Sequence, residues 1–332
     1  MKLKNGLLLS LLLALSFCAI AQGDNALRTA YCDGAMAHVQ GLVVDERGLP
    51  VSNATVRVEF SSLGDVARSN VASVHTDEVG RFEASGRANW KIDCSVRRTG
   101  YYDSSFSVSF YDAKACRVQE GEWVHDGLTR KVVLRRIQTR KALSIFPESR
   151  RMGTWKIPVL NEWIGFDLET FDWVSPYGTG VHDDMLLRFS ARTISHVRGS
   201  YQMEVCFTNN PCAGMHLGEG DALSDLKIPH VADPSGVYVG YHRFERNFTG
   251  ENKTDTYLKK GMYAVVRTRT KVDADGKLVS ACYGVISGMW ISGGKTMRME
   301  DASFNSACND LAIEDGYYLR KRLEEYNCRN RE

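Results

Sequence analysis

Residues 41–58 read GLVVDERGLPVSNATVRV, and residues 76–82 read TDEVGRF. In both stretches, alternating apolar residues stop at a turn that ends in glycine, Asp-Glu-Arg-Gly48 and Asp-Glu-Val-Gly80. Glycine tolerates the positive φ that a tight turn requires, and a period of two is typical of a strand. Each stretch therefore predicts a strand–turn–strand unit.

The same period continues from Ala37 to Arg136, interrupted by turn residues. This pattern is typical of an all-β sandwich. Seven strands of this length fit one seven-stranded Greek-key β-sandwich over residues 37–140, with residues 22–36 as a short lead-in. The strands are expected near 38–45, 54–60, 70–76, 80–85, 90–98, 104–111 and 129–136.

The two turn units, together with Gly100-Tyr101, resemble the carboxypeptidase regulatory-like domain. This resemblance implies a small transthyretin-like β-sandwich found in secreted and surface proteins, where it is typically a non-catalytic scaffold. The chain departs from the common pattern at Asn53, where a glycine often precedes the alanine. The resemblance covers residues 37–136, so it implies nothing about the activity of the larger second part.

Residues 141–332 are expected to form a second, larger β-rich domain with a C-terminal helix. Residues 201–207 and 262–270 alternate cleanly, and Asp273-Ala-Asp-Gly276 predicts a hairpin turn to the strand that starts at Leu278. Leu319, Leu323 and Tyr326 share one helical face. Residues 163–180 and Tyr283-Gly284 resemble β-rich modules of uncharacterised secreted bacterial proteins, to which no activity is attached.

The first 21 residues predict an export signal. Lys2 and Lys4 precede an apolar stretch at 6–17, and Ala19-Ile-Ala21 fits a cleavage site. The apolar stretch is shorter than the roughly 20 residues of a transmembrane helix. We expect a periplasmic, cell-surface or extracellular protein of a bacterium. Leu15-Ser-Phe-Cys18 weakly resembles a lipoprotein signal, which leaves acylation of Cys18 open.

The charge balance argues against nucleic acid as a partner. Without the two lysines of residues 1–21, basic and acidic side chains balance at 40 each. A neutral chain lacks the basic excess typical of nucleic-acid binding. The local basic stretch from Arg130 to Lys156 is interpreted as outward charge on an edge strand, which discourages sheet-to-sheet pairing. Possible partners are a carbohydrate or another envelope protein, and the oligomeric state stays open.

Eight cysteines remain beyond Cys18, and an even number in an exported protein predicts disulfides. Cys206 and Cys212 flank a turn-rich loop that could bring them into bonding range. If all eight pair, at least one bridge must join the two halves. The candidates are Cys32, Cys94, Cys116, Cys206, Cys212, Cys282, Cys308 and Cys328.

Residues 163–184 hold the densest group of aromatic and acidic residues. Aromatic rings beside carboxylates can line a sugar-binding surface, and the hypothesis assigns ligand contact to Trp163, Trp173, Tyr177, Asp167 and Asp172. A weaker alternative is a cation site at His182, Asp183 and Asp184, because hard cations prefer carboxylate oxygens. The structural alternative is that the aromatics fill a core and the aspartates stabilise turns.

No catalytic or cofactor motif emerges from the sequence. There is no His-Glu-x-x-His, Gly-x-Ser-x-Gly or phosphate-binding loop. We therefore expect an exported, non-catalytic binding or structural protein that needs no cofactor. Two alternatives stay open: a secreted hydrolase with acidic residues in the second domain, and a self-assembling surface component.

Overall fold

The computed structural model describes residues 25–61, 70–111, 116–138, 143–145, 152–195, 198–207, 211–221, 223–249, 252–258 and 261–314. The predicted export signal, Cys18, Cys328 and the predicted C-terminal helix lie outside these residues. The chain divides into two compact units. Unit 1 comprises the residues up to Ile137 together with Leu223–Asp225, and unit 2 comprises Gln138–Ala222 and the residues from Leu226.

The prediction of a mainly β chain is confirmed. Each of the seven strands predicted in the first domain corresponds to a strand of unit 1, and two short strands join them. The elements of unit 1 are α2 (Asn25–Asp33), β1 (Ala35–Asp45), β2 (Thr55–Ser61), β3 (Asn70–His75), β4 (Arg81–Ala88), β5 (Lys91–Arg97), β6 (Ser104–Ser109), β7 (Arg117–Gln119), β8 (Glu122–Val124), the 3-10 helix η1 (Asp126–Leu128) and β9 (Thr129–Leu134).

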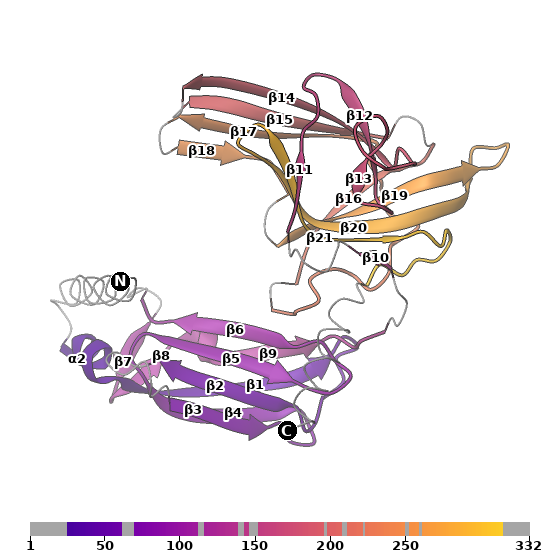
Figure 1. Cartoon of the computed structure of the whole chain (residues 1–332). Helices are drawn as coiled ribbons and strands as arrows, with labels where there is room; N and C mark the ends of the chain where they lie inside the picture. The colour runs from indigo at the N-terminus through magenta and orange to yellow at the C-terminus, as the bar shows by residue number, and fades with distance from the viewer. Residues whose placement is uncertain are drawn as a thin grey trace, which may run out of the picture. The chain divides into compact units, whose positions relative to one another are not determined.

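Unit 1 is built from two sheets (Figure 1). One has the order β3-β2-β5-β6, and the other has the order β4-β1-β8-β7 with β9 also pairing β1. Strand β1 is antiparallel to β4 and parallel to β9. Alternate side chains of both sheets share one apolar core, to which β2 contributes Val56, Val58 and Phe60. The period of two in the sequence therefore reflects one buried face per sheet.

Within the predicted lead-in at 22–36, the described residues from Asn25 form a helix followed by the start of β1. Leu27, Ala30 and Tyr31 are the buried residues of α2, at the i, i+3, i+4 spacing of a helical face. Tyr31 lies 5.5 Å from the ring of Trp123 in β8. The helix is therefore stabilised by contact with a strand that sequence periodicity did not predict.

A short segment from the second half of the sequence belongs to unit 1. The Ser105 N–H donates to the Leu223 carbonyl at 2.7 Å, and the Asp225 N–H donates to the Asp103 carbonyl at 2.8 Å. Ser104 and Ser224 are both buried. Residues 223–225 thus extend the sheet of unit 1 at β6. The prediction of two consecutive domains, 37–140 and 141–332, placed these residues in the second domain.

Unit 2 contains twelve strands among the described residues. They are β10 (Ser144–Ile145), β11 (Met152–Lys156), β12 (Trp163–Asp167), β13 (Asp172–Trp173), β14 (Met185–Ser195), β15 (Arg198–Cys206), β16 (Gly214–Glu219), β17 (Tyr241–Thr249), β18 (Asn252–Asp255), β19 (Met262–Val272), β20 (Leu278–Ser292) and β21 (Thr296–Asn305).

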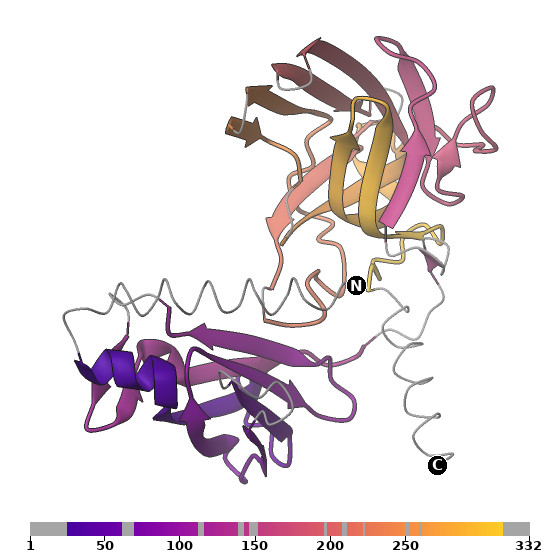
Figure 2. The same cartoon turned by 60° about the vertical axis from the view of Figure 1, so that its left-hand side comes forward.

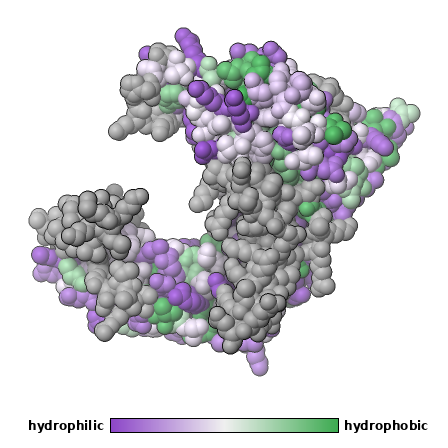
Figure 3. All heavy atoms as spheres, viewed as in Figure 1, coloured by the Kyte–Doolittle hydropathy of each residue, from purple (hydrophilic) through white to green (hydrophobic). Residues whose placement is uncertain are grey.

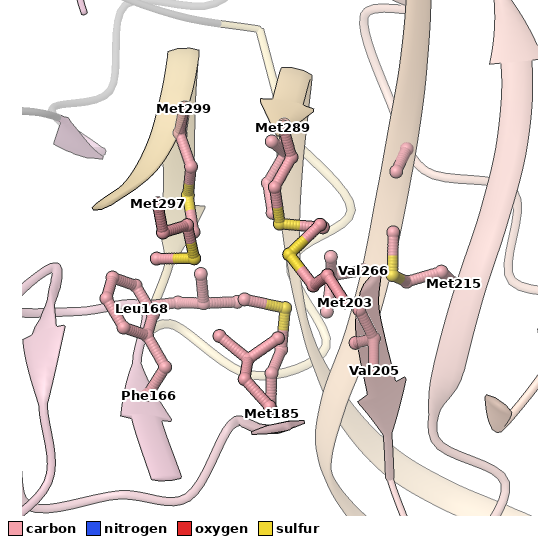
Figure 4. Close-up of a cluster of buried hydrophobic side chains, with 14 of the residues drawn as sticks. Phe166, Leu168, Met185, Met203, Val205, Met215, Val266, Met289, Met297 and Met299 are labelled. Atoms are coloured by element: carbon pink, nitrogen blue, oxygen red, sulfur yellow. The ribbon is translucent and has the colours of Figure 1, made fainter. Parts of the chain in front are cut away.

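Two sheets of unit 2 share a second core (Figure 2). Their orders are β13-β12-β14-β15-β17-β18 and β10-β21-β20-β19-β16, with β11 also pairing β21. Methionines dominate the middle of this core (Figure 4), and they are Met185, Met203, Met215, Met289, Met297 and Met299. Unbranched, polarisable methionine side chains fill irregular gaps between facing strands.

No helix in the described parts of the chain is both long and apolar enough to cross a membrane.

Candidate functional site

One arginine of β19, Arg269, binds carboxylates at the end of β12, in the loop between β12 and β13 and in the loop before β14. Its Nε and Nη2 atoms each lie 2.9 Å from a carboxylate oxygen of Asp184, and its Nη1 lies 2.6 Å from Glu169. Nη2 also reaches Asp167 at 3.3 Å. Arg269 sits in a bulge of β19 with a φ of 50°, a place where a bulge can re-aim a side chain. Three acidic residues of the 163–184 segment, of which Asp167 and Asp184 belong to the predicted sites, therefore surround a cation that the protein itself provides.

The pKa values of the two buried carboxylates of this group shift in opposite directions. Burial raises the pKa of Asp184 above 3.8, and the hydrogen bonds and charge of Arg269 only partly oppose it. Burial also acts to raise the pKa of Asp167. The backbone N–H groups of Val181, Glu169, His182 and Thr170 outweigh that effect, so the pKa of Asp167 is lowered. Asp167 is thus an ionised acceptor for the backbone of the loop.

Asp172 also stabilises the backbone of the loop. Its Oδ1 accepts from the Trp173 N–H, and its Oδ2 accepts from the N–H and the hydroxyl of Thr179, all at 2.8 Å. Burial acts to raise the pKa of Asp172, but these hydrogen bonds hold it below 3.8. Asp167 and Asp172, which the hypothesis assigns to ligand contact, both accept backbone hydrogen bonds in the turns that they begin.

Trp173 lies in the core, which corrects its assignment to ligand contact. It is 4% exposed, packs edge-on against Phe166 and Phe189, and donates from Nε1 to the Lys156 carbonyl at 3.0 Å. Strand β13 pairs with β12 so that Trp173 lies opposite Phe166, and both rings therefore point to the same, inner face. A large ring on the inner face of a sheet is buried, whatever its neighbours in sequence.

Trp163 is on the opposite face of the same sheet and is 40% exposed. The β12-β14-β15-β17 register places Trp163 opposite Arg188, Arg188 opposite Glu204, and Glu204 opposite Arg243. We call the outward face of these four strands the Trp163 face. Its outward side chains include Trp163, Arg188, Arg192, Glu204, Tyr241 and Arg243.

The centre of the Trp163 face is a chain of polar contacts. The Arg188 guanidinium lies 4.7 Å from the centroid of the Trp163 ring, and its Nε lies 2.6 Å from Glu204. The Tyr241 hydroxyl donates to the other oxygen of Glu204. The hydrogen bond from Arg188 lowers the pKa of Glu204 to about 2, assisted by Tyr241 and opposed by burial. These contacts fix the ring of Trp163 in an exposed position on a rigid sheet.

The remaining predicted site residues are exposed but are not brought together. Tyr177 is 43% exposed on the turn after β13, and His182 and Asp183 are also exposed. The third residue of the predicted cation site, Asp184, is buried and bound to Arg269. Across the described ranges, no three His, Cys, Asp or Glu side chains are grouped so that they could hold a metal ion.

One cysteine pair of the predicted set is bridged: Cys282 and Cys308, with Cα atoms 4.2 Å apart. The suggested pairing of Cys206 with Cys212 is not formed, since both thiols are free. Cys206 is buried on β15, whereas Cys212 is exposed in the turn before β16. Cys94 is free in the core of unit 1, where burial raises its pKa to about 12. These three cysteines of the candidate set are therefore unpaired.

Unit 1 carries a polar triplet that sequence reasoning did not single out. His38 Nδ1 lies 2.8 Å from the Ser85 hydroxyl, and His38 Nε2 lies 3.3 Å from Glu122. The arrangement of Ser85, His38 and Glu122 resembles the nucleophile, base and orienting acid of a catalytic triad. However, the His38 and Glu122 side chains are 45% and 54% exposed on an open sheet surface, which does not exclude water from a reacting group. We assign it no catalysis.

Comparison with known proteins gives no family. No protein-family model matches the chain, and no curated protein matches it. A 3-chlorocatechol 1,2-dioxygenase from Rhodococcus opacus 1CP is 13% identical, with a TM-score of 0.26 over 31% of this chain and 61% of that chain. A catechol 1,2-dioxygenase from Pseudomonas arvilla C-1 is 15% identical, with a TM-score of 0.24 over 32% and 54%. This chain thus spans less than two thirds of the length of these structures. TM-scores of this size support no conclusion about the fold or the activity of this chain.

Proposed function

We propose that this chain is an exported, non-catalytic binding protein that contacts a carbohydrate of the bacterial envelope through the Trp163 face. One observation carries the proposal: an exposed tryptophan, braced by Arg188, at the edge of a broad polar sheet face. The expected export signal and the disulfide agree with a location outside the cytoplasm.

The surroundings of Trp163 suit a sugar. An indole ring offers an apolar plane for the face of a sugar ring, while neighbouring hydroxyl, amide and guanidinium groups can bond to sugar hydroxyls. The outward positions next to the Arg188 row are Ser190, Gln202 and Glu245, paired across the strands. Figure 3 shows hydrophilic and near-neutral residues over much of the visible surface of unit 2, with apolar patches among them.

The acidic residues of the predicted site support binding over hydrolysis. A glycosidase needs two carboxyl groups that can face a substrate. Both oxygens of Asp167 and of Asp184 already accept hydrogen bonds from Arg269, from backbone N–H groups, or from both. These two residues therefore act as structural acceptors in unit 2.

The test is a glycan array read with the mature chain and with Trp163→Ala. We expect Trp163→Ala to weaken binding about 30-fold, equivalent to about 2 kcal/mol, which is the usual cost of removing an aromatic anchor. Tyr111→Ala is the matched control, because Tyr111 is 39% exposed but belongs to unit 1. Tyr177→Ala in parallel shows whether the turn after β13 contributes.

Unchanged glycan binding by Trp163→Ala would reject the Trp163 face as the ligand surface. Light scattering on the same two samples tests the alternative of self-assembly, in which Trp163→Ala would lower the molar mass instead.

A further inference from the structure

We infer that the ligand of the Trp163 face is an acidic, linear polysaccharide. This inference rests on the proposed function and adds the charge and length of the ligand. The outward positions of β14, β15 and β17 carry four arginines and two glutamates. On these three strands the face carries more arginines than glutamates, although the chain beyond residue 21 is neutral in formal charge.

Two of the four arginines form ion pairs with glutamates of the same sheet. Arg188 lies 2.6 Å from Glu204, and Arg243 lies 2.5 Å from Glu245. The other two, Arg192 and Arg198, are exposed and have no carboxylate partner among the described residues. An arginine without a carboxylate partner on a polar face suits an anionic ligand, because the guanidinium fork matches a carboxylate with two parallel hydrogen bonds.

The sheet register places these arginines beside other sugar-compatible groups. Arg192 lies opposite Ser200, and Ser200 lies opposite Asn247. A hydroxyl and an amide can bond to sugar hydroxyls while the guanidinium binds a carboxylate. This end of the Trp163 face thus offers an anion contact and neutral hydrogen-bonding groups in one row.

The distance along β14 requires a ligand of several units. Trp163 lies opposite Arg188, four residues before Arg192, and four residues of a strand span about 13 Å. This spacing is larger than one sugar ring, so a ligand of several units suits contact with both residues. A linear chain lying along β14 can do both, with one unit on the indole and a carboxylate on Arg192.

The experiment compares two probes by titration calorimetry on the mature chain. Oligomers of polygalacturonate are the acidic probe, and cellohexaose is the neutral probe. We expect polygalacturonate to bind more tightly, and to weaken at least tenfold when NaCl rises from 50 to 500 mM, because salt screens exposed charges. Arg192→Gln should weaken polygalacturonate binding about tenfold and leave cellohexaose binding unchanged. Arg81→Gln, an exposed arginine of β4 in unit 1, is the matched control and should bind as the wild type does.

Several results would overturn the inference. Equal binding of both probes, or no effect of Arg192→Gln, would show that the ligand is not recognised by its charge. Equally tight binding of an oligothymidylate would point to a nucleic acid instead. The Trp163→Ala variant shows which of the two proposals has failed. If the wild type binds cellohexaose but not polygalacturonate, and Trp163→Ala abolishes cellohexaose binding, only the acidic ligand is rejected. If the Trp163→Ala variant binds every probe as the wild type does, or if the wild type binds neither sugar, both proposals are rejected.

Discussion

Asp45, Asp77 and Asp273 each begin a four-residue turn that ends in a glycine with positive φ. In each case the Oδ1 atom accepts from the backbone N–H groups two and four residues later, at 2.7–3.1 Å. Such contacts are local, so the Asp-x-x-Gly pattern predicts them. The Asp184–Arg269 pair joins residues 85 positions apart, and no local pattern predicts it.

Glu204 gives the stability of unit 2 a dependence on acid pH. Its pKa is about 2 in the folded protein against an ordinary value of 4.5, chiefly because Arg188 donates to it. Its stabilising contribution is therefore complete above pH 4.5 and is lost as the pH falls towards 2. We expect the difference in unfolding free energy between wild type and Glu204→Gln, about 1–3 kcal/mol at pH 7 in favour of wild type, to shrink between pH 5 and pH 3.

Urea unfolding of both proteins at pH 7, 5, 4 and 3 measures this difference. A difference that stays constant across the series would show that Arg188 does not stabilise the charged form of Glu204.

Long strands were predictable, whereas elements defined by a partner were not. The strands β14, β15, β19 and β20 each place side chains in the methionine-rich core, and parts of three of them were predicted. Strands β19 and β20 also bury consecutive residues, so both of their faces are covered over part of their length. The strands β7 and β8 are three residues long and pair with each other. Three residues are too few to show a period. Helix α2 was missed because its apolar face spans only two turns.

Arg269 connects two elements, the loop before β14 and the bulge of β19. We expect Arg269→Ala to destabilise unit 2 by about 3–5 kcal/mol, because Asp184 and Asp167 would remain buried without their cation. Arg243→Ala removes a more exposed arginine paired with Glu245 and should cost less than about 1 kcal/mol. Urea unfolding followed by tryptophan fluorescence measures both losses.

Similar losses for the two arginine variants would mean that the buried acidic group does not depend on Arg269.

At the scale of the whole molecule, the described disulfide lies within unit 2. Cys282 is on β20, and Cys308 follows β21, so the bridge links a core strand to the turn that leaves the sheet. A bridge between the halves was required only if all eight cysteines pair, and that condition is not met, because Cys94, Cys206 and Cys212 are free. The division into units follows the two cores instead of cysteine pairing.

Removing the bridge should weaken unit 2 without unfolding unit 1. The two cysteines are 26 residues apart, and closing a loop of this length is worth about 3 kcal/mol. We expect the double variant Cys282→Ser and Cys308→Ser to lower the unfolding free energy of unit 2 by about that amount. Calorimetry with and without reductant measures the loss, and reductant should have no effect on the double variant.

Modification of the native, unreduced protein with a thiol reagent is the control. Exposed Cys212 should react, whereas buried Cys94 should not. Rapid labelling of Cys282 in the purified, unreduced protein would contradict the bridge.

The sequence by itself determined a mainly β chain, the approximate positions of seven strands of unit 1 and the Asp-x-x-Gly turns, because these depend on neighbours within a few residues. Only the tertiary structure decided which aromatics of residues 163–184 are buried. Trp163 and Trp173 have similar local surroundings, but sheet pairing turns Trp173 inward with Phe166 and Trp163 outward onto Arg188. The face of a sheet on which a ring lies depends on strand register, and register is set by contacts between distant residues.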